Sequence, residues 1–161
     1  MPSSSRPARE RPTILVPVDF SLCSGTALGK ARSWAAEHGG KIVVLHVIDH
    51  DFVAQCIREH LGSENEIKKT LFLNAKIRLR DFLRGEDMDG DGVETAVCEG
   101  IPCIEINKKA LACDADMIVM GSRGHADEMK TIFFGSTTER VLRFIRRPVL
   151  CVPPKENHGH K

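Results

Sequence analysis

Five runs of hydrophobic, largely β-branched residues alternate along the chain with segments whose hydrophobic positions recur at helical spacing. The runs predict strands at residues 13–19, 41–49, 93–100, 115–124 and 147–153, the fourth together with its exit turn. The first two runs lack the alternation of a strand with one face in water, so we expect them to be covered on both faces.

The intervening segments predict helices at residues 21–40, 51–84, 102–113 and 136–146. Ser63 with Glu66 and Ser136 with Glu139 have the spacing of capping boxes, in which serine and glutamate satisfy backbone N–H groups at a helix start. Strands buried on both sides and alternating with helices indicate an α/β fold with an open, doubly wound, five-stranded parallel sheet and helices on both faces. Such Rossmann-like sheets bind ligands beyond the carboxyl ends of their strands.

Length and composition narrow the possible functions. The 161 residues suit one domain, predicted at 13–153, with tails at 1–12 and 154–161. The net charge of +1 argues against a nucleic-acid partner, which requires a basic excess. No hydrophobic run reaches the ~18–20 residues of a membrane span. The six cysteines lack zinc-ligand spacing, so we expect reduced thiols in a cytoplasmic protein.

The strongest chemical signal follows the fourth predicted strand. Gly121 and Gly124 come first, and after ten further residues Gly135 precedes Ser136 and Thr137 at a predicted helix start. Glycine permits positive φ and a close approach of backbone N–H groups to an anion, and a helix start attracts negative charge. Arg123 adds a positive charge. Asp19, which ends the first strand, can accept hydrogen bonds from a ribose or a base, so the set predicts a nucleotide site.

Three other patterns are weaker. Residues 25–31 resemble a phosphate-binding P-loop, but the spacing is one residue short and Ala31 replaces the hydroxyl residue, so we expect a helix. Residues 87–92 match the start of an EF-hand loop without its final glutamate, so we expect a polar turn, with weak calcium binding left open. His46, in the middle of a strand, is expected to be a packing residue.

The segments ILVPVD, VVLHVID, ADMIVMGSRG, GSTTERVL and RPVLCVP together resemble the universal stress proteins, in particular their ATP-binding subgroup. The resemblance covers about residues 13–153 and implies the strand order 3-2-1-4-5. The family motif has nine residues between its second and third glycines, whereas this chain has ten, and we expect the extra residue within 126–130.

The resemblance implies that ATP, or AMP or ADP, is bound with Mg²⁺ or Mn²⁺ on the phosphates. The implied site comprises Pro17, Val18, Asp19, Val47, Met120, Gly121, Ser122, Arg123, Gly124, Gly135, Ser136 and Thr137. It also implies a homodimer through the last strand, at Val149, Leu150, Cys151 and Val152, and a regulatory role in stress with an unidentified protein partner.

Two alternatives remain open at the level of sequence. One is a slow metal-dependent nucleotide hydrolase, although no nucleophile–base pair is evident and catalysis is not the leading interpretation. The other is a dimerisation module that functions without a nucleotide.

Overall fold

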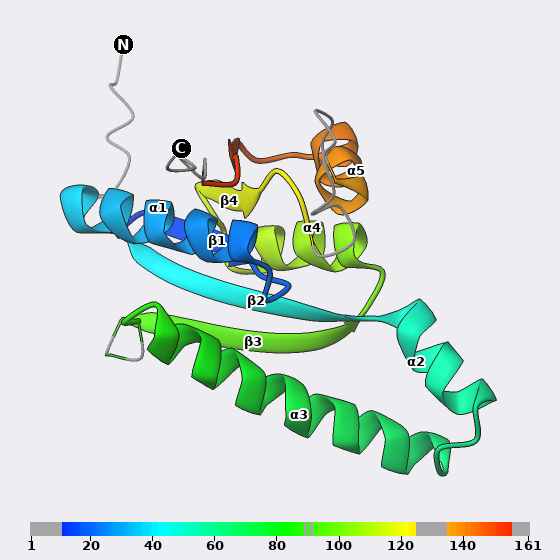
Figure 1. Ribbon diagram of the computed structural model, residues 1–161. Helices are drawn as coiled ribbons and strands as arrows, with labels where there is room; N and C mark the ends of the chain where they lie inside the picture. The colour runs from blue at the N-terminus through cyan, green and yellow to red at the C-terminus, as the bar shows by residue number, and fades with distance from the viewer. Residues whose placement is uncertain (1–10, 89, 91, 125–134, 156–161) are drawn as a thin grey trace, which may run out of the picture.

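The computed structural model describes residues 11–88, 90, 92–124 and 135–155. In the described residues strands and helices alternate, except that two helices follow each other between the second and third strands (Figure 1). In chain order the elements are β1 (Thr13–Pro17), α1 (Leu22–His38), β2 (Lys41–Asp49), α2 (His50–Arg58), α3 (Glu64–Gly85), β3 (Val93–Gly100), α4 (Pro102–Ala112), β4 (Met117–Gly121), α5 (Ser136–Phe144) and β5 (Val149–Val152).

The five strands form one parallel sheet in the order β3-β2-β1-β4-β5, which confirms the predicted fold and strand order. β1 is the central strand and pairs with β2 and with β4. The chain therefore reverses its direction of winding between β1 and β4. That reversal opens a crevice at the carboxyl ends of these two strands, where doubly wound proteins bind ligands.

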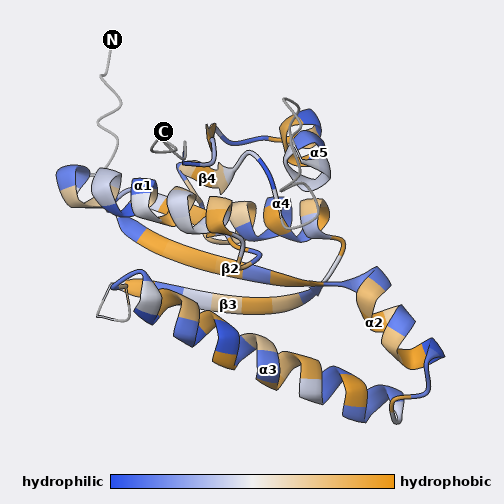
Figure 2. Ribbon diagram, in the orientation of Figure 1, coloured by the Kyte–Doolittle hydropathy of each residue, from blue (hydrophilic) through white to orange (hydrophobic). Residues whose placement is uncertain are grey.

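Two hydrophobic cores, one on each face of the sheet, hold the layers together. On one face, Leu28 of α1 and Leu79 of α3 pack against Ile14 and Val44. On the other face, Ile106 of α4 and Val141 of α5 pack against the sheet residue Ile118. Figure 2 shows β2 hydrophobic along most of its length, as expected for a strand covered on both faces, whereas hydrophobic and hydrophilic positions alternate along α3.

The predicted helical region 51–84 is two helices. α2 ends at Arg58, and His60 and Gly62 have φ of 53° and 142° in the turn that follows. Ser63 then caps α3 with the predicted capping box: the N–H of Glu66 donates to Ser63 Oγ, and the N–H of Ser63 donates to the Glu66 carboxylate. Positive φ interrupts a helix, which is why one periodic pattern folds as two elements.

The second predicted capping box, at Ser136 and Glu139, is wrong. The N-cap of α5 is Gly135, with φ −61° and ψ 158°, and no side chain caps this helix among the described residues. Ser136 is instead the first helical residue. The predicted strands 13–19 and 147–153 are longer than the observed β1 (Thr13–Pro17) and β5 (Val149–Val152), whereas the predicted strand and exit turn at 115–124 contain β4 (Met117–Gly121).

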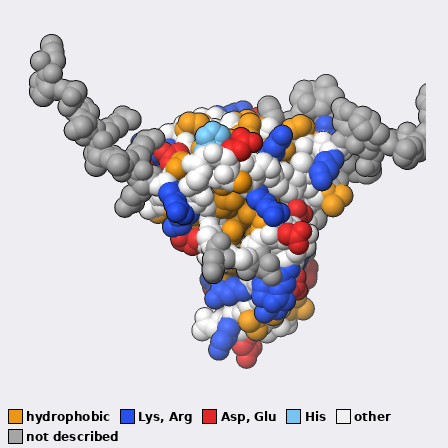
Figure 3. Space-filling model, turned by 90° about the vertical axis from the view of Figure 1, so that its left-hand side faces the viewer, with side chains coloured by type: hydrophobic (Ala, Val, Ile, Leu, Met, Phe, Trp, Pro, Cys, Tyr) orange, Lys and Arg blue, Asp and Glu red, His pale blue; other side chains and the backbone are white. Residues whose placement is uncertain are grey.

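Figure 3 views the end of the sheet at which the strands begin, opposite the carboxyl ends. Lys and Arg side chains and Asp and Glu side chains are interspersed there around a small hydrophobic patch. This mixture agrees with the balanced charge of the chain. In the described part of the chain, no helix has the length and hydrophobicity to cross a membrane.

Candidate functional site

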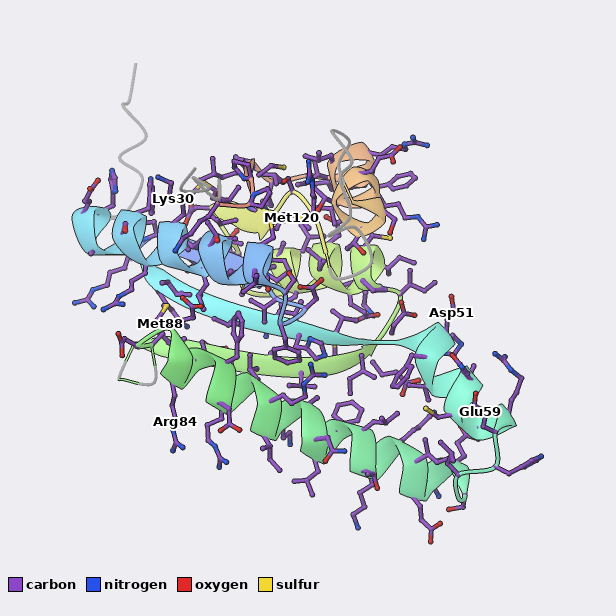
Figure 4. All side chains as sticks on the ribbon, in the orientation of Figure 1. Lys30, Asp51, Glu59, Arg84, Met88 and Met120 are labelled. Carbon is purple, nitrogen blue, oxygen red and sulfur yellow. The ribbon has the colours of Figure 1, made fainter. Side chains whose placement is uncertain are left out.

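A cleft of about 340 Å³ lies at the carboxyl ends of β1, β2 and β4, on the side covered by α4 and α5. Its volume falls within the ~300–1,000 Å³ of small-molecule sites. Met120, labelled in Figure 4, lies near the carboxyl end of β4 and forms part of its wall. The lining residues are Pro17, Val18, Asp19, Ser24, Leu45, Val47, Asp49, Pro102, Ile106, Met120, Gly121, Arg123, Gly124, Gly135, Ser136, Thr137 and Thr138.

All the predicted site residues except Ser122 line this cleft. The backbone N–H of Ser122 donates to the carbonyl oxygen of Val152 at 2.9 Å, and its carbonyl oxygen accepts from the N–H of Gly135 at 2.7 Å. Ser122 therefore joins the end of β5 to the start of α5. The placement brings together residues that are more than 100 positions apart in the sequence, such as Asp19 and Gly124.

Two glycines are required at the cleft because other chain segments approach them closely. A Cβ built on Gly124 would lie 2.7 Å from Asp19 Oδ2, and one on Gly121 would lie 2.8 Å from Cys23 Sγ. We expected positive φ at such glycines, but the positive φ angles among the described glycines belong to Gly39, Gly62 and Gly92. The absence of a side chain is therefore what matters at Gly121 and Gly124.

The start of α5 faces the cleft and supplies its electrostatic character. Gly135, Ser136 and Thr137 line the cleft, and the first N–H groups of a helix carry partial positive charge. The Thr138 hydroxyl donates to the carbonyl oxygen of Gly121 at 2.8 Å in a buried bond. This bond connects the start of α5 to the end of β4. It therefore fixes the position of Gly135 relative to Gly121.

Asp19 is presented to the cleft by a tightly hydrogen-bonded turn. Its Oδ1 accepts from the N–H of Ser21 at 3.0 Å, and the N–H of Val18 donates to the carbonyl oxygen of Leu45 at 2.8 Å. Between them Phe20 has a φ of 67°. This left-handed conformation costs a non-glycine residue about 1–3 kcal/mol, and it persists only where the surroundings impose it.

Several lining residues were not among the predicted site residues. Leu45 lies two positions before Val47, on the same face of β2, so strand periodicity was the signal that identifies it. Thr138 lies directly after the predicted Thr137. Asp49 is the last residue of β2, so its place at the carboxyl end of a strand was the signal that identifies it. The remaining positions depend on how the helices pack on the sheet, which the local pattern does not specify; they are Ser24, Pro102 and Ile106.

The weaker sequence patterns do not form sites in the described structure. Residues 25–31 lie within helix α1, which confirms that they are not a P-loop. In the described ranges no group of three His, Cys, Asp or Glu side chains could hold a metal ion. Asp89 and Asp91 of the EF-hand-like stretch, and the predicted extra residue within 126–130, lie outside the described residues. Burial raises the pKa of Cys98, Cys113 and Cys151, which makes these thiols less reactive.

The fold and the cleft define a doubly wound α/β protein with a cleft of small-molecule size at the point where the strand order reverses. The sequence profile of the Universal stress protein family matches residues 10–153. The chain belongs to the universal stress protein family.

Individual relatives agree with this assignment. Universal stress protein MJ0577 of Methanocaldococcus jannaschii is 32% identical over 156 residues, which cover 89% of this chain and 96% of the relative. Universal stress protein MJ0531 of the same organism is 31% identical over an alignment that covers 89% of this chain and 84% of the relative. The solved structure of MJ0577 superposes with a TM-score of 0.76 at 33% identity, over 91% of this chain and 98% of that chain.

Two further structures share the fold and are described as nucleotide complexes. A universal stress protein in complex with cAMP has a TM-score of 0.62 at 19% identity, over 91% of this chain and 100% of that chain. A universal stress protein from Archaeoglobus fulgidus in complex with dAMP has a TM-score of 0.51 at 22% identity, over 89% of this chain and 98% of that chain. At these identities the likeness concerns the fold alone.

Proposed function

We propose that the protein binds an adenine nucleotide, with ATP as the leading ligand, in the cleft at the carboxyl ends of β1, β2 and β4. The observation that carries the proposal is the juxtaposition of Asp19, Gly124 and the N-terminus of α5 around one cavity. A carboxylate suits the hydroxyl and amino donors of a nucleoside, and a helix start suits phosphate. The complexes of the same fold with cAMP and dAMP show that this architecture can hold such ligands.

The cleft offers separate surroundings for the parts of a nucleotide. Leu45, Val47 and Ile106 form an apolar region that suits the flat base. Arg123 and the start of α5 form the cationic and donor-rich region that suits the phosphates. Mg²⁺ or Mn²⁺ would be bound mainly by the phosphate oxygens of the nucleotide, as is usual for Mg²⁺ at such sites.

We further propose that the protein is a regulatory, stress-response homodimer of the cytosol. β5 is an edge strand, and Leu150 on it is 40% exposed, so an apolar edge is available for a second copy. The six free cysteines, three of them buried, suit a reducing compartment. Nucleotide binding would then alter a surface to which a protein partner binds.

The direct test is calorimetric titration of ATP, with Mg²⁺, into nucleotide-free protein. We expect saturable binding with a dissociation constant below 1 mM, which corresponds to about −4.1 kcal/mol. Asp19→Ala should weaken it at least tenfold, whereas Asp51→Ala, which removes an exposed carboxylate on α2, should leave it unchanged. No saturable binding below millimolar ATP contradicts the proposal.

A further inference from the structure

The residue after Asp19 is anchored on the opposite face of the sheet from the cleft. The ring of Phe20 contacts that of His46, with 4.4 Å between the centroids and the planes tilted by 34°, and it packs edge-to-face with Phe82 at 5.6 Å. The guanidinium of Arg78 lies 4.4 Å from the centroid of Phe20. Arg78 and Phe82 belong to α3, so a helix that does not line the cleft contacts the turn that carries Asp19.

His46 also holds the backbone of this turn. Its Nδ1 lies 2.8 Å from the carbonyl oxygen of Val18, and because that oxygen can only accept, Nδ1 carries the proton and donates. The N–H of Val18 is bonded to Leu45, so β2 satisfies both backbone groups of Val18. Burial lowers the pKa of His46, which favours the neutral ring in this position.

Consecutive residues of the turn therefore face opposite sides of the sheet. Asp19 lines the cleft next to Gly124, and the partly buried Phe20 packs against the core that α1 and α3 cover. The left-handed φ of Phe20 requires support from its surroundings, and His46, Phe82 and Arg78 supply that support. Loss of these contacts would let the turn relax and move the Asp19 carboxylate, which lies so close to Gly124 that a Cβ there would be 2.7 Å from Asp19 Oδ2.

We propose that His46, Phe20 and Arg78 are positioning residues for the nucleotide site, which set the place of the Asp19 carboxylate from the far face of the sheet. The inference rests on the proposed nucleotide binding. On this proposal, three residues that do not line the cleft affect nucleotide affinity. Because Arg78 belongs to α3, this helix also contributes to nucleotide affinity.

The first experiment replaces His46 with phenylalanine, which keeps a flat ring against Phe20 and removes the donor to Val18. His38→Phe is the matched control, because His38 Nδ1 lies 2.9 Å from the Trp34 carbonyl oxygen and its ring stacks on Trp34 at 4.2 Å. We expect His46→Phe to raise the dissociation constant for ATP about tenfold and His38→Phe to leave it unchanged. Equal affinity of both variants and the parent overturns the proposal.

The second experiment guards against a variant that fails to fold. Arg78→Gln removes the cation above Phe20 from an exposed position, and Lys69→Gln removes one charge elsewhere on the exposed surface of α3. We expect Arg78→Gln to weaken ATP binding about threefold at unchanged thermal stability, and Lys69→Gln to have no effect. A loss of affinity that is the same in both variants points to net charge and overturns the proposed role of Arg78.

A ligand-free measurement separates this inference from the proposed function. The amide of Ser21 is bonded to Asp19 Oδ1, so its hydrogen exchange reports on the position of that carboxylate. We expect His46→Phe to accelerate exchange at Ser21, while His38→Phe leaves it unchanged. If the parent protein binds no ATP and this acceleration is seen, the proposed nucleotide binding fails, while the placement of the Asp19 carboxylate by His46 stands. If exchange at Ser21 is unchanged, the positioning role fails.

Discussion

At the scale of single residues, steric room and burial decide the properties of the cleft. The charged and hydroxyl residues Asp19, Arg123 and Ser136 could be predicted because each follows a strand or begins a helix. The reason for the glycines could not be predicted from their own segment. Gly124 is required by Asp19 and Gly121 by Cys23, which are distant in sequence and close in space.

We expect Gly124→Ala to weaken ATP binding at least tenfold, because the added Cβ would lie 2.7 Å from Asp19 Oδ2. Calorimetric titration of the purified variant measures the effect. Gly29→Ala is the matched control, since its Cβ meets no atom within 4 Å and alanine favours the interior of α1. ATP affinity that Gly124→Ala leaves unchanged contradicts the account of this position.

His46 makes stability depend on pH. Burial, with a smaller contribution from Arg78, lowers the pKa of His46 below its ordinary value of 6.5, against opposing effects of the Val18 hydrogen bond and Asp19. Between pH 6.5 and the lowered pKa of folded His46, the unfolded chain binds a proton that the folded chain does not. The free energy of unfolding therefore falls as the pH drops through this window and levels off below it. Above about pH 7 His46 is neutral in both the folded and the unfolded chain, so it does not make the free energy of unfolding depend on pH.

Urea denaturation at a series of pH values between 7 and 5 measures this dependence. We expect His46→Phe to show a flatter decline than the parent protein, while His38→Phe keeps the parent's decline. Parallel curves for the parent protein and both variants contradict the assignment of the pH dependence to His46.

At the scale of elements, α5 is held to the sheet by a buried hydroxyl. The strands and most helices could be predicted because their hydrophobic periods are strong. The start of α5 at Ser136 was also predicted, but its cap was not, because Ser136 and Glu139 match a capping box by spacing alone and the structure places the N-cap at Gly135. Thr138, which bonds to Gly121, carries the link between α5 and β4 instead.

We expect Thr138→Val to reduce the free energy of unfolding by about 1–3 kcal/mol, because it removes a buried donor to the Gly121 carbonyl oxygen without changing the side-chain shape. Thr26→Val is the control, since Thr26 donates to Leu22 at an exposed position. Denaturation curves give both values. A loss that is no larger in Thr138→Val than in Thr26→Val contradicts the link.

At the scale of the whole molecule, the sheet has two edges of different character. β3 has eight residues and lies beside α3, whereas β5 has four residues and carries the exposed Leu150. The open edge at β5 is the basis of the proposed homodimer, which the resemblance to the family implied from the sequence.

We expect the protein to sediment as a dimer and Leu150→Lys to sediment as a monomer, because a buried lysine at a two-fold edge places like charges together. Leu73→Lys, which changes an exposed leucine on α3, should remain dimeric. Analytical ultracentrifugation at micromolar concentration distinguishes these states. A monomeric parent protein, or a dimeric Leu150→Lys, contradicts the proposed interface.

The central claim is that a nucleotide occupies the cleft between Asp19, the glycines of β4 and the start of α5. Titration of ATP with Mg²⁺ into isotope-labelled protein, followed through the backbone amide signals, tests it most directly. We predict saturable shifts of the amide signals of Gly121, Gly124 and Gly135 below about 1 mM ATP, while the signals of Gly29 and Gly85 do not shift. A dissociation constant of 1 mM corresponds to about −4.1 kcal/mol. Saturable shifts confined to other parts of the protein, or no shifts at that concentration, would contradict the claim.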